Sequence, residues 1–493
     1  MSDQTESGVI PGRIATQAAA RCRATHPALV GAAALLLGGC ASTAIDDNFA
    51  SAQAFGRERL SAEVRWLTTD EARARARADV DAALDGPLTG DSAEAIALAY
   101  SPSLQALLYD RAAASAAATQ SARLPNPVFA FERLVSSSAA LQNVEITRSL
   151  AISLTDLLLL PARAELAEIR QRQVRLKLAG DVVATAIDAR RAWVDAVATR
   201  QAVAYAQRVL EAADAAAELA RRMQSAGNFS ALQRAREQAF SAEAAVQLAR
   251  SRRLALASRE ALVRVLGLDD AQASRLKLPE TLPALPPASL DEHALAQRAL
   301  GDRIDLRLAI QDLESTAREL GLTHVTSFVD GFEVAATDKR ETVLPTRSGY
   351  ELRLALPLFD FGDAGRARAE ATYMAALHRA AQVGIDAGSK LRDAYGRYHA
   401  AYDVAQRYRD EIVPLRKAIS DENLLRYNGM LIGVFELVAD AREQVATVAQ
   451  AMDAQRDFWL ADAGLRAELI GLPGTGALSG DVAMRRATEA GNP

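Results

Sequence analysis

Two carboxylates are the residues whose spacing most readily suggests chemistry. Glu436 and Asp440 stand four residues apart in a stretch of helix-forming residues, so they occupy one face of a helix, one turn apart. Carboxylates placed in this way can attract cations, or they can form ion pairs with arginines. Asp440 could pair with Arg442 or Arg426 on a solvated helix face. The sequence leaves both interpretations open.

Catalytic and metal-binding constellations are missing from the sequence. The five histidines are scattered, and none lies three or four residues from another, which is the spacing that joint metal ligands on a helix need. The glycines in 361–365 have no lysine after them and do not match a phosphate-binding loop. Neither a nucleophile elbow nor an HExxH sequence is present. We therefore expect no enzyme activity, no metal site and no cofactor.

A short apolar run precedes one of the two cysteines. Residues 27–37 follow an arginine-containing segment and lead into Leu37-Gly38-Gly39-Cys40. The run is too short to span a bilayer as a helix but fits the central part of a secretory signal. Its ending resembles a bacterial lipobox, which implies that residues 1–39 are a lipoprotein signal peptide and that Cys40 is acylated. The alternative interpretation is the start of a buried helix.

The composition favours long helices. Half of the 493 residues are hydrophobic but only 5% are aromatic, and alanine, leucine, arginine, glutamate and glutamine dominate. The formal net charge is −5, with acids and bases interspersed, so no nucleic-acid partner is indicated. After Cys40 no apolar run reaches the roughly eighteen residues that a membrane helix needs. Any crossing of a membrane must therefore use strands.

The sequence contains a twofold internal repeat. Gly227-Asn228-Phe229 and the Ala-Arg-Glu-Gln at 235–238 are matched by Gly433-Val434-Phe435 and the Ala-Arg-Glu-Gln at 441–444. Residues 149–156 likewise match 353–360, and 102–104 match 304–306. Three matches in the same order indicate a duplicated unit.

Each unit predicts a helix, two strands and a long helical hairpin. Proline is absent between Pro161 and Pro279, so the first hairpin has arms of about 90–100 Å at 1.5 Å per residue. Glycines at the tips, Gly227-Asn228-Phe229 and Gly429-Met430 to Gly433, are expected to give the backbone the freedom that a turn needs. Pro414, inside the second hairpin, predicts a kink or break without a counterpart in the first.

The strand-like segments alternate between apolar and polar residues. From Val144 to Leu154, valine, isoleucine and leucine alternate with glutamate, threonine and serine, which indicates a sheet with one apolar face. Pro161 and Pro357 are expected to mark the junctions from strand to helix. Four strands cannot close a barrel and leave open edges, which indicates oligomerisation. The alternative is a small soluble layer that caps the helices.

The predicted organisation follows from these elements. Residues 1–39 form the signal peptide, 40–87 an N-terminal segment, and 473–493 a flexible tail. The first repeat spans 88–285, with strands at about 127–135 and 143–155 and a hairpin over 161–267. The second spans 286–472, with strands at about 323–335 and 346–359 and a hairpin over 363–471.

These features together resemble the TolC family of outer-membrane factors, and its lipid-anchored members in particular. The resemblance covers Cys40 to about Leu472. It rests on the lipobox, on Ser101-Pro102-Ser103-Leu104, on Pro125-Asn126-Pro127, on the strand end 356–362 and on the tip Tyr427-Asn428-Gly429. The fold class it implies is mainly α with a membrane β-barrel portion, in which a homotrimer combines four strands per subunit into a twelve-stranded barrel above a periplasmic α-barrel.

The resemblance also implies function and partners. It suggests a passive channel in the bacterial outer membrane, anchored by lipid at Cys40 and extending into the periplasm. The hairpin tips would dock onto a periplasmic adaptor protein that works with an inner-membrane pump. Glu436 and Asp440 would ring the channel aperture and favour cations, so the exported compounds would include heavy metals among small toxic molecules. A periplasmic lipid-anchored adaptor and a coiled-coil scaffold are the alternatives, but an adaptor needs only one hairpin.

Overall fold

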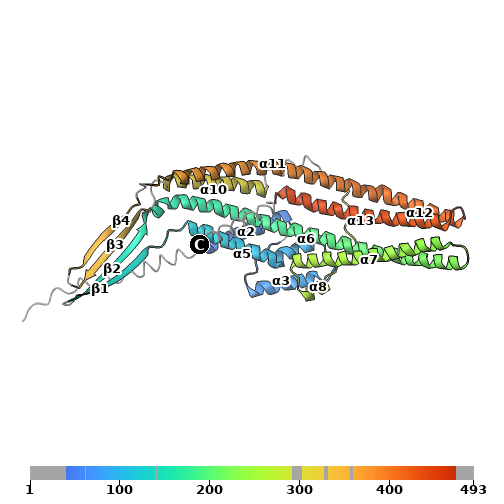
Figure 1. Cartoon of the computed structure of the whole chain (residues 1–493), viewed down its shortest axis with the longest axis horizontal. Helices are drawn as coiled ribbons and strands as arrows, with labels where there is room; N and C mark the ends of the chain where they lie inside the picture. Colours follow the sequence, from blue (N-terminus) through green and yellow to red (C-terminus); the bar gives the residue numbers. More distant parts are fainter. Residues whose placement is uncertain are drawn as a thin grey trace, which may run out of the picture.

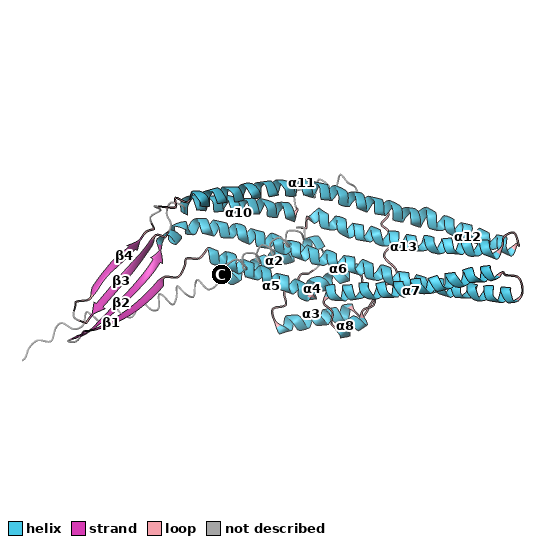
Figure 2. Cartoon of the chain, in the orientation of Figure 1, coloured by secondary structure: helices cyan, strands magenta, loops and turns pink. Residues whose placement is uncertain are grey.

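The molecule is elongated, with a sheet at one end and the tips of two helical hairpins at the other (Figure 1). The computed structural model describes residues 40–60, 63–138, 141–290, 303–326, 331–342, 344–355 and 359–472. Strands are confined to one end, and helices make up almost all the rest (Figure 2). The expected architecture of long helical hairpins with four strands is confirmed. In the described ranges, no helix is both long and apolar enough to cross a membrane.

Four helices form the N-terminal part of the described residues. They are α2 (Cys40–Leu60), α3 (Asp70–Ala83), α4 (Gly90–Tyr100) and α5 (Pro102–Ser121). Thr69 and Thr89 cap α3 and α4, because the side chain of each accepts a hydrogen bond from a backbone amide in the first turn. Helices α2, α4 and α5 all contact the long helix α6 (Leu154–Ser225). The N-terminal segment is thereby fixed to the side of the first hairpin.

The sheet has four antiparallel strands in sequence order. These are β1 (Val128–Ser138), β2 (Leu141–Ser153), β3 (Glu333–Glu341) and β4 (Arg347–Arg353). The pairing register aligns side chains in rows, so that Phe129, Leu150, Ala336 and Tyr350 lie on one face. The opposite face is polar and carries the ion pair between Lys339 and Glu145. The Phe129 face is mainly apolar but also carries Arg148 and the ion pair between Arg340 and Asp338. Two open edges remain in a single chain.

The third strand lies later in the chain than the sequence predicts. A strand was expected over 323–335, but helix α10 (Ile304–Thr326) continues past its start. Strand β3 instead occupies 333–341, in what reads as a polar loop. It pairs with β2 along nine residues, and Thr337 lies opposite Ser149. Pairing with a neighbouring strand, and not its own apolar pattern, holds this segment extended.

Hairpin 1 consists of α6 and α7 (Ala231–Leu266). Helix α6 has 72 residues and is therefore about 110 Å long. It begins at Leu154, where the Ser153 side chain accepts a hydrogen bond from the Asp156 amide. The prediction that Pro161 marks the junction is wrong, because Pro161 lies inside α6. A serine cap starts the helix before the proline is reached. Pro357, the matching prediction, lies outside the described residues.

Hairpin 2 has the same plan with one interruption. Its first arm comprises α11 (Asp363–Arg407), a π-helical turn η1 (Tyr408–Ile412) and α12 (Val413–Asn428), and its second arm is α13 (Val434–Ile470). The break predicted from Pro414 is confirmed, since the π-helical turn η1 ends at Ile412, two residues before it. Proline has no amide proton to donate and crowds the preceding turn, so the regular helical hydrogen bonds cannot continue through it.

An extended segment ties the two hairpins together at mid-length. After α8 (Asp270–Arg275), the chain crosses from hairpin 1 to hairpin 2. The carbonyl of Pro283 accepts hydrogen bonds from Gln455 and Trp459 of α13, and that of Pro286 accepts one from Tyr402 of α11. Apolar clusters lie beneath this belt on both hairpins. The belt therefore marks one side of the layer of long helices.

Candidate functional site: the hairpin tips and the second hairpin

The chain reverses direction at the two hairpin tips with different backbone conformations. Gly227 has a positive φ of 80°, as expected for glycine at a turn. In hairpin 2 the residue with positive φ is Met430, at 59°. Gly429 and Gly433 have φ of −80° and −82°, which any residue can adopt, so the expectation that both need glycine is wrong. In hairpin 2 the left-handed backbone conformation is therefore adopted by Met430, the residue after Gly429.

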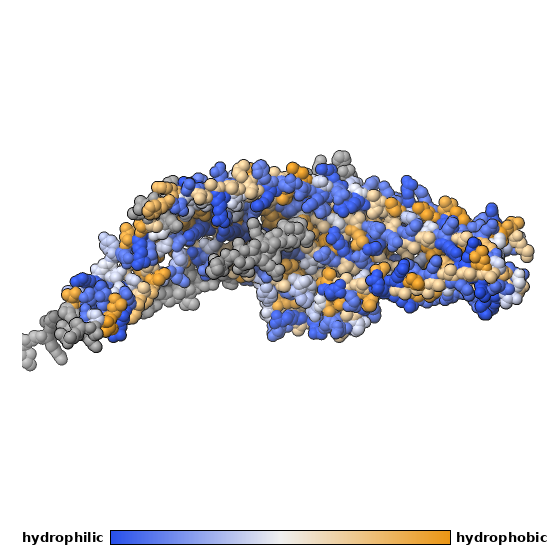
Figure 3. Space-filling model, viewed as in Figure 1, coloured by the Kyte–Doolittle hydropathy of each residue, from blue (hydrophilic) through white to orange (hydrophobic). Residues whose placement is uncertain are grey.

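Hydrophobic side chains reach the surface at the end of hairpin 2 (Figure 3). Met430 is 93% exposed and Leu431 is 77% exposed. Single exposed apolar residues are ordinary, but two in succession at an exposed turn are suited to contact another protein. In hairpin 1, Asn228 is exposed, whereas Phe229 is 9% exposed and packs inward. The two tips thus present different surfaces.

Phe229 and Phe435 join the two tips. Their rings are stacked with centroids 5.0 Å apart and planes 10° apart. A small cavity of about 20 Å³ lies beside them, lined by Leu219 and Met223 of α6 and by Val438 of α13. These are the phenylalanines of the repeated Gly-x-Phe sequence. Stacked aromatic pairs stabilise such contacts by about 1 kcal/mol beyond area burial.

An ion pair connects the hairpins just above the phenylalanines. Arg442 of α13 donates to Glu237 of α7 at 3.1 Å. The Arg442 guanidinium also lies 4.3 Å from the ring centre of Phe240, at the distance of a cation–π contact. Glu237 is only 5% exposed. Arg442 therefore neutralises an acid of the other hairpin and cannot neutralise Asp440.

Asp440 is buried inside hairpin 2. It is 6% exposed, and its carboxylate lies 3.0 Å from the Arg416 guanidinium of α12. Arg416 also donates to the Asp440 carbonyl and lies 2.6 Å from Glu443. The predicted pairing with Arg442 or Arg426 is wrong, since Arg426 binds Glu422. Asp440 is a buried acid that holds the two arms together.

Glu436 and two further acids share one exposed face of α13. Glu436, Glu443 and Asp457 are exposed and separated by multiples of seven residues, which places them on one face. Asp453 is also exposed, but it lies 18 residues after Phe435 and therefore on the side of α13 that Phe435 occupies. At 100° per residue, the face that carries the three acids is turned away from Gln455 and Trp459, which hold the belt. Sequence reasoning identified Glu436 but missed the rest of this acidic stripe. The seven-residue spacing was the signal that could have revealed it.

Two carboxyl groups along α13 have perturbed pKa values. Burial raises the pKa of Asp462, and nearby Arg466 and Arg190 only partly oppose this effect. Partial desolvation by neighbouring atoms, together with repulsion from Asp457, raises the pKa of Asp453, although part of this residue is exposed. Arg456 opposes that shift. Asp453 is thus expected to take up a proton at a higher pH than an ordinary aspartate.

Glu436 also takes part in the turn. Its carboxylate accepts a hydrogen bond from the Gly433 amide at 3.3 Å, which satisfies a donor at the start of α13. An acid in the first helical turn is also favoured by the helix dipole. Capping and exposure are compatible, because one carboxylate oxygen can accept the amide while the group faces water.

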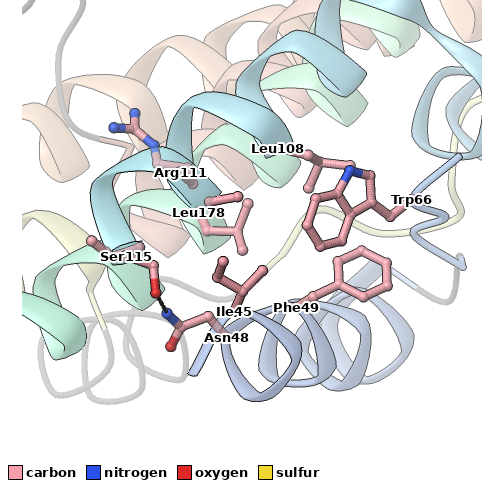
Figure 4. Close-up of a pocket in the computed structure, with 10 residues that line it drawn as sticks. Ile45, Asn48, Phe49, Trp66, Leu108, Arg111, Ser115 and Leu178 are labelled. Atoms are coloured by element: carbon pink, nitrogen blue, oxygen red, sulfur yellow. Dashed lines mark hydrogen bonds between the residues drawn. The ribbon is translucent and has the colours of Figure 1, made fainter. Parts of the chain in front are cut away.

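Helix α2, which starts at Cys40, is held in place by polar and aromatic contacts (Figure 4). Phe49 of α2 contacts Trp66, with ring centroids 5.5 Å apart. Asn48 donates to Ser115 of α5 and to Gln171 of α6. A cavity of only about 10 Å³ remains between them. Helix α2 is therefore firmly held against the first hairpin.

An open cleft of about 900 Å³ lies on hairpin 1 next to the belt. Its walls carry Arg200, Arg252, Arg259 and Lys277 over a floor of alanines and Leu256. Arg259 donates to the carbonyls of Ala273 and Leu276. No group of three or more metal-ligating side chains occurs in the part of the chain that the structure describes.

Comparison with known proteins separates sequence from fold. No family model matches the chain, and no curated protein matches it. Solved structures match over most of their length. CusC aligns with a TM-score of 0.65 at 13% identity, covering 78% of this chain and 92% of CusC. VceC from Vibrio cholerae aligns with a TM-score of 0.65 at 16% identity, covering 81% and 98%.

The chain has the TolC-like fold. A further match supports this assignment, because the MtrE outer membrane channel of Neisseria gonorrhoeae, in its open state, aligns with a TM-score of 0.63 at 17% identity, covering 77% of this chain and 88% of MtrE. The TolC-like fold accounts for the four strands, the paired hairpins and the belt in one arrangement. At these identities the likeness concerns the fold alone.

Proposed function

We propose that this protein is the outer-membrane channel component of an efflux system, a passive conduit for small toxic compounds. The observation that carries the proposal is the combination, in one chain, of a four-stranded sheet with an apolar face and hairpins about 100 Å long. Among proteins of the same fold, MtrE is described as an outer membrane channel and VceC as an outer membrane protein. A helical scaffold would have no use for an exposed apolar sheet.

The sheet needs other copies of the chain to complete it. Strands β1 and β4 each have one unpaired edge, and an unpaired strand edge is not tolerated in lipid. Three copies would supply twelve strands, with the Phe129 and Tyr350 face towards lipid and the Lys339 and Glu145 face inward. The protein is therefore a homotrimer in the outer membrane, and its helices extend into the periplasm.

The hairpin tips are the contact for a periplasmic adaptor protein, which couples the channel to an inner-membrane pump. Support comes from the exposed Met430 and Leu431 and from the position of both tips farthest from the sheet. Asn228 and Gly227 would contribute on hairpin 1. Phe229 contributes indirectly, because it holds the tips together.

Glu436 is the aperture residue of the conduit, and the acidic stripe above it favours cations, heavy metals among them. The stripe faces away from the belt, and stacked like charges in a narrow passage select cations. Asp440 has no place in the aperture, because its buried carboxylate is neutralised by Arg416. The protein needs no cofactor and performs no catalysis.

Cys40 is the site of a lipid anchor to the outer membrane. It is the first residue of α2, whose docking onto α5 and α6 would transmit the anchor to the channel body. Acylation supplies membrane affinity that adds to that of the strands.

A deletion strain tests the proposed function. Loss of the gene should increase sensitivity to efflux substrates, and metal salts and drugs should be compared side by side. Restoring the full chain should restore resistance, and the protein should migrate as a trimer in the outer-membrane fraction. Monomers in the inner membrane, with unchanged sensitivity to every compound, would reject the proposal.

A further inference from the structure

The open cleft on hairpin 1, here called the basic cleft, lies where α6 and α7 run side by side next to α8 (Figure 1). One face of each long helix forms a wall, and the first residues of the belt border one end. The lining residues recur at helical spacing, as 196, 200, 203, 204 and 207 on α6 and as 252, 255, 256 and 259 on α7. The volume of about 900 Å³ is within the range of about 300–1,000 Å³ that is common for small-molecule sites.

Arg252 provides the positive charge at the end of the basic cleft that lies away from the belt. Helices α6 and α7 run antiparallel in hairpin 1, and the Arg252 guanidinium donates to the side chain of Gln207 at 2.9 Å. Seven residues separate Arg252 from Arg259, which lines the belt end of the cleft. At 1.5 Å per residue, this spacing corresponds to about 10 Å along the helix. The basic cleft therefore carries cations at two separate places.

Three cations line the belt end of the basic cleft, and backbone carbonyls hold them there. Arg200 donates to the carbonyl of Leu278, Arg259 donates to those of Ala273 and Leu276, and Lys277 donates to that of Asp85. These acceptors are neutral, so the hydrogen bonds fix the side chains without cancelling their charge. A guanidinium group has five N–H donors and an ammonium group has three. Each cation therefore keeps donors for a ligand.

Neighbouring acids do not balance the charge of the basic cleft. Within the described ranges, none of its four cations forms an ion pair with a carboxylate. Among the lining residues, Glu280 is the one acid, and it is exposed. Glu211 lies nearby and accepts a hydrogen bond from Gln207 at 3.1 Å, while the Asp85 carboxylate binds Arg275 at 2.7 Å. A cleft with an excess of one sign of charge concentrates ions of the opposite sign.

Apolar side chains separate the two groups of cations. Val203 and Ala204 lie on the α6 wall, and Ala255 and Leu256 lie on the α7 wall. Leu256 is 62% exposed although it lines the cleft. Covering such a side chain with an apolar part of a ligand is favourable. The basic cleft thus combines cations at both ends with an apolar middle, which suits a molecule that is both apolar and anionic.

We propose that the basic cleft binds an elongated organic dianion, which has an anionic group at each end and an apolar chain between them. The three belt-end cations hold one anionic group and Arg252 holds the other, through charge-assisted hydrogen bonds that are stronger than those to the neutral carbonyls. The bound molecule bridges α6, α7 and the belt. The cleft borders the belt, whereas the acidic stripe of α13 faces away from the belt. The site therefore lies off the proposed conduit and does not depend on it.

Linear carboxylates of different length and charge test the proposal. Binding of decanedioate to the purified full chain in a non-ionic detergent is measured by equilibrium dialysis at low ionic strength, with protein-free micelles as the blank. Decanoate has only one charged end, as a lipid does, and butanedioate is too short to reach both ends of the cleft. Each should bind at least about fivefold more weakly than decanedioate, which is the effect expected for losing one exposed charge contact.

Two substitutions on α7 have matched controls two residues away, on the other side of the helix. Arg252→Gln should weaken binding of decanedioate about fivefold and leave decanoate, held at the belt end, unchanged, whereas Arg250→Gln, outside the cleft, should change neither. Leu256→Asp should weaken both ligands, and Leu254→Asp, at another exposed leucine, should not. Equal affinities of the unsubstituted protein for decanedioate and decanoate, or no difference between the variants and their controls, would overturn the proposal and leave the proposed function untouched.

Discussion

The two hairpins belong to the two copies of a duplicated sequence unit, but they differ in backbone conformation and in the residues buried between their arms. Hairpin 1 has two uninterrupted helices and turns at a glycine, Gly227. Hairpin 2 has a π-helical turn before Pro414, turns at Met430, and encloses the buried pair of Asp440 and Arg416. The π-helical turn, the left-handed methionine and the ion pair buried between two arms all lie in the second copy.

The buried ion pair between its two arms distinguishes the second hairpin from the first. A buried ion pair stabilises little over a well-packed apolar contact, but leaving one partner alone is costly. The Asp440 and Arg416 contact therefore fixes one arrangement of the arms without adding much stability. Glu237 of hairpin 1 binds Arg442 on the side of α13 that faces hairpin 1. Near the tips, this pair and the stacked Phe229 and Phe435 rings join the two hairpins.

Removing Arg416 should have the largest effect. Arg416→Leu leaves the Asp440 carboxylate buried without its cation, and we expect a loss of about 3 kcal/mol in the stability of hairpin 2. Hydrogen exchange should increase in α12 and α13 and change little in α6. Arg426→Leu, which removes only an exposed pair with Glu422, is the control. Equal protection in both variants would show that the buried pair does not distinguish the hairpins.

The contact between the tips of the two hairpins should contribute less to stability than the ion pair buried within hairpin 2. Arg442→Ala removes the contacts with Glu237 and Phe240 and leaves the buried Glu237 carboxylate without its cation; because Arg442 is itself partly exposed, water can reach the site and we expect a loss of about 2 kcal/mol. Exchange should increase at both tips together. An increase confined to hairpin 2 would mean that the tips move independently.

Much of the difference between the two hairpins could be predicted from the sequence, and there are physical reasons why the rest could not. Alternation and helix-forming composition are local, so the strands, the hairpins and the break at Pro414 could be predicted. Strand β3 could not, because its residues are extended only through pairing with β2. The two Gly-x-Phe sequences are 206 residues apart, whereas the buried acids of the two hairpins, Glu237 and Asp440, are 203 residues apart.

The position of the candidate site along the chain could be predicted from the sequence, but its ion pairs could not. Glu436 and Asp440 share a turn of sequence, yet one is exposed and the other buried. Burial depends on Arg416, which lies 24 residues away across the hairpin. No local pattern connects Arg416 to Asp440. The exposed stripe through Glu443 and Asp457 was local, and its spacing could have been read directly.

The tips should respond oppositely to matched substitutions. Met430→Gly relieves a left-handed backbone on a residue with a side chain, and we expect a gain of up to about 1 kcal/mol. Gly227→Ala introduces the same strain, with a loss of similar size. Thermal unfolding of both variants measures the difference. Losses in both would contradict the assignment of Met430 as the counterpart of Gly227.

Acidification should have the smallest effect, and only on the second hairpin. The pKa of Asp453 is raised, so as pH falls this residue becomes neutral before an ordinary aspartate does, and negative charge beside Asp457, at the edge of the stripe, is lost first. Cation selectivity of the channel should weaken slightly under mildly acidic conditions. Asp453→Asn should remove this part of the pH dependence. A dependence that persists unchanged in the variant would exclude Asp453 as its source.

Single-channel recording in planar bilayers tests the central claim, that this chain assembles into a conduit whose second hairpin sets its selectivity. The purified protein should form cation-selective channels. Glu436→Gln should reduce the preference for cations, and Asp440→Asn, at a buried position paired with Arg416, should not change the charge that permeating ions meet. Absence of channels, or a preference for cations that Glu436→Gln leaves intact and Asp440→Asn abolishes, would contradict the account.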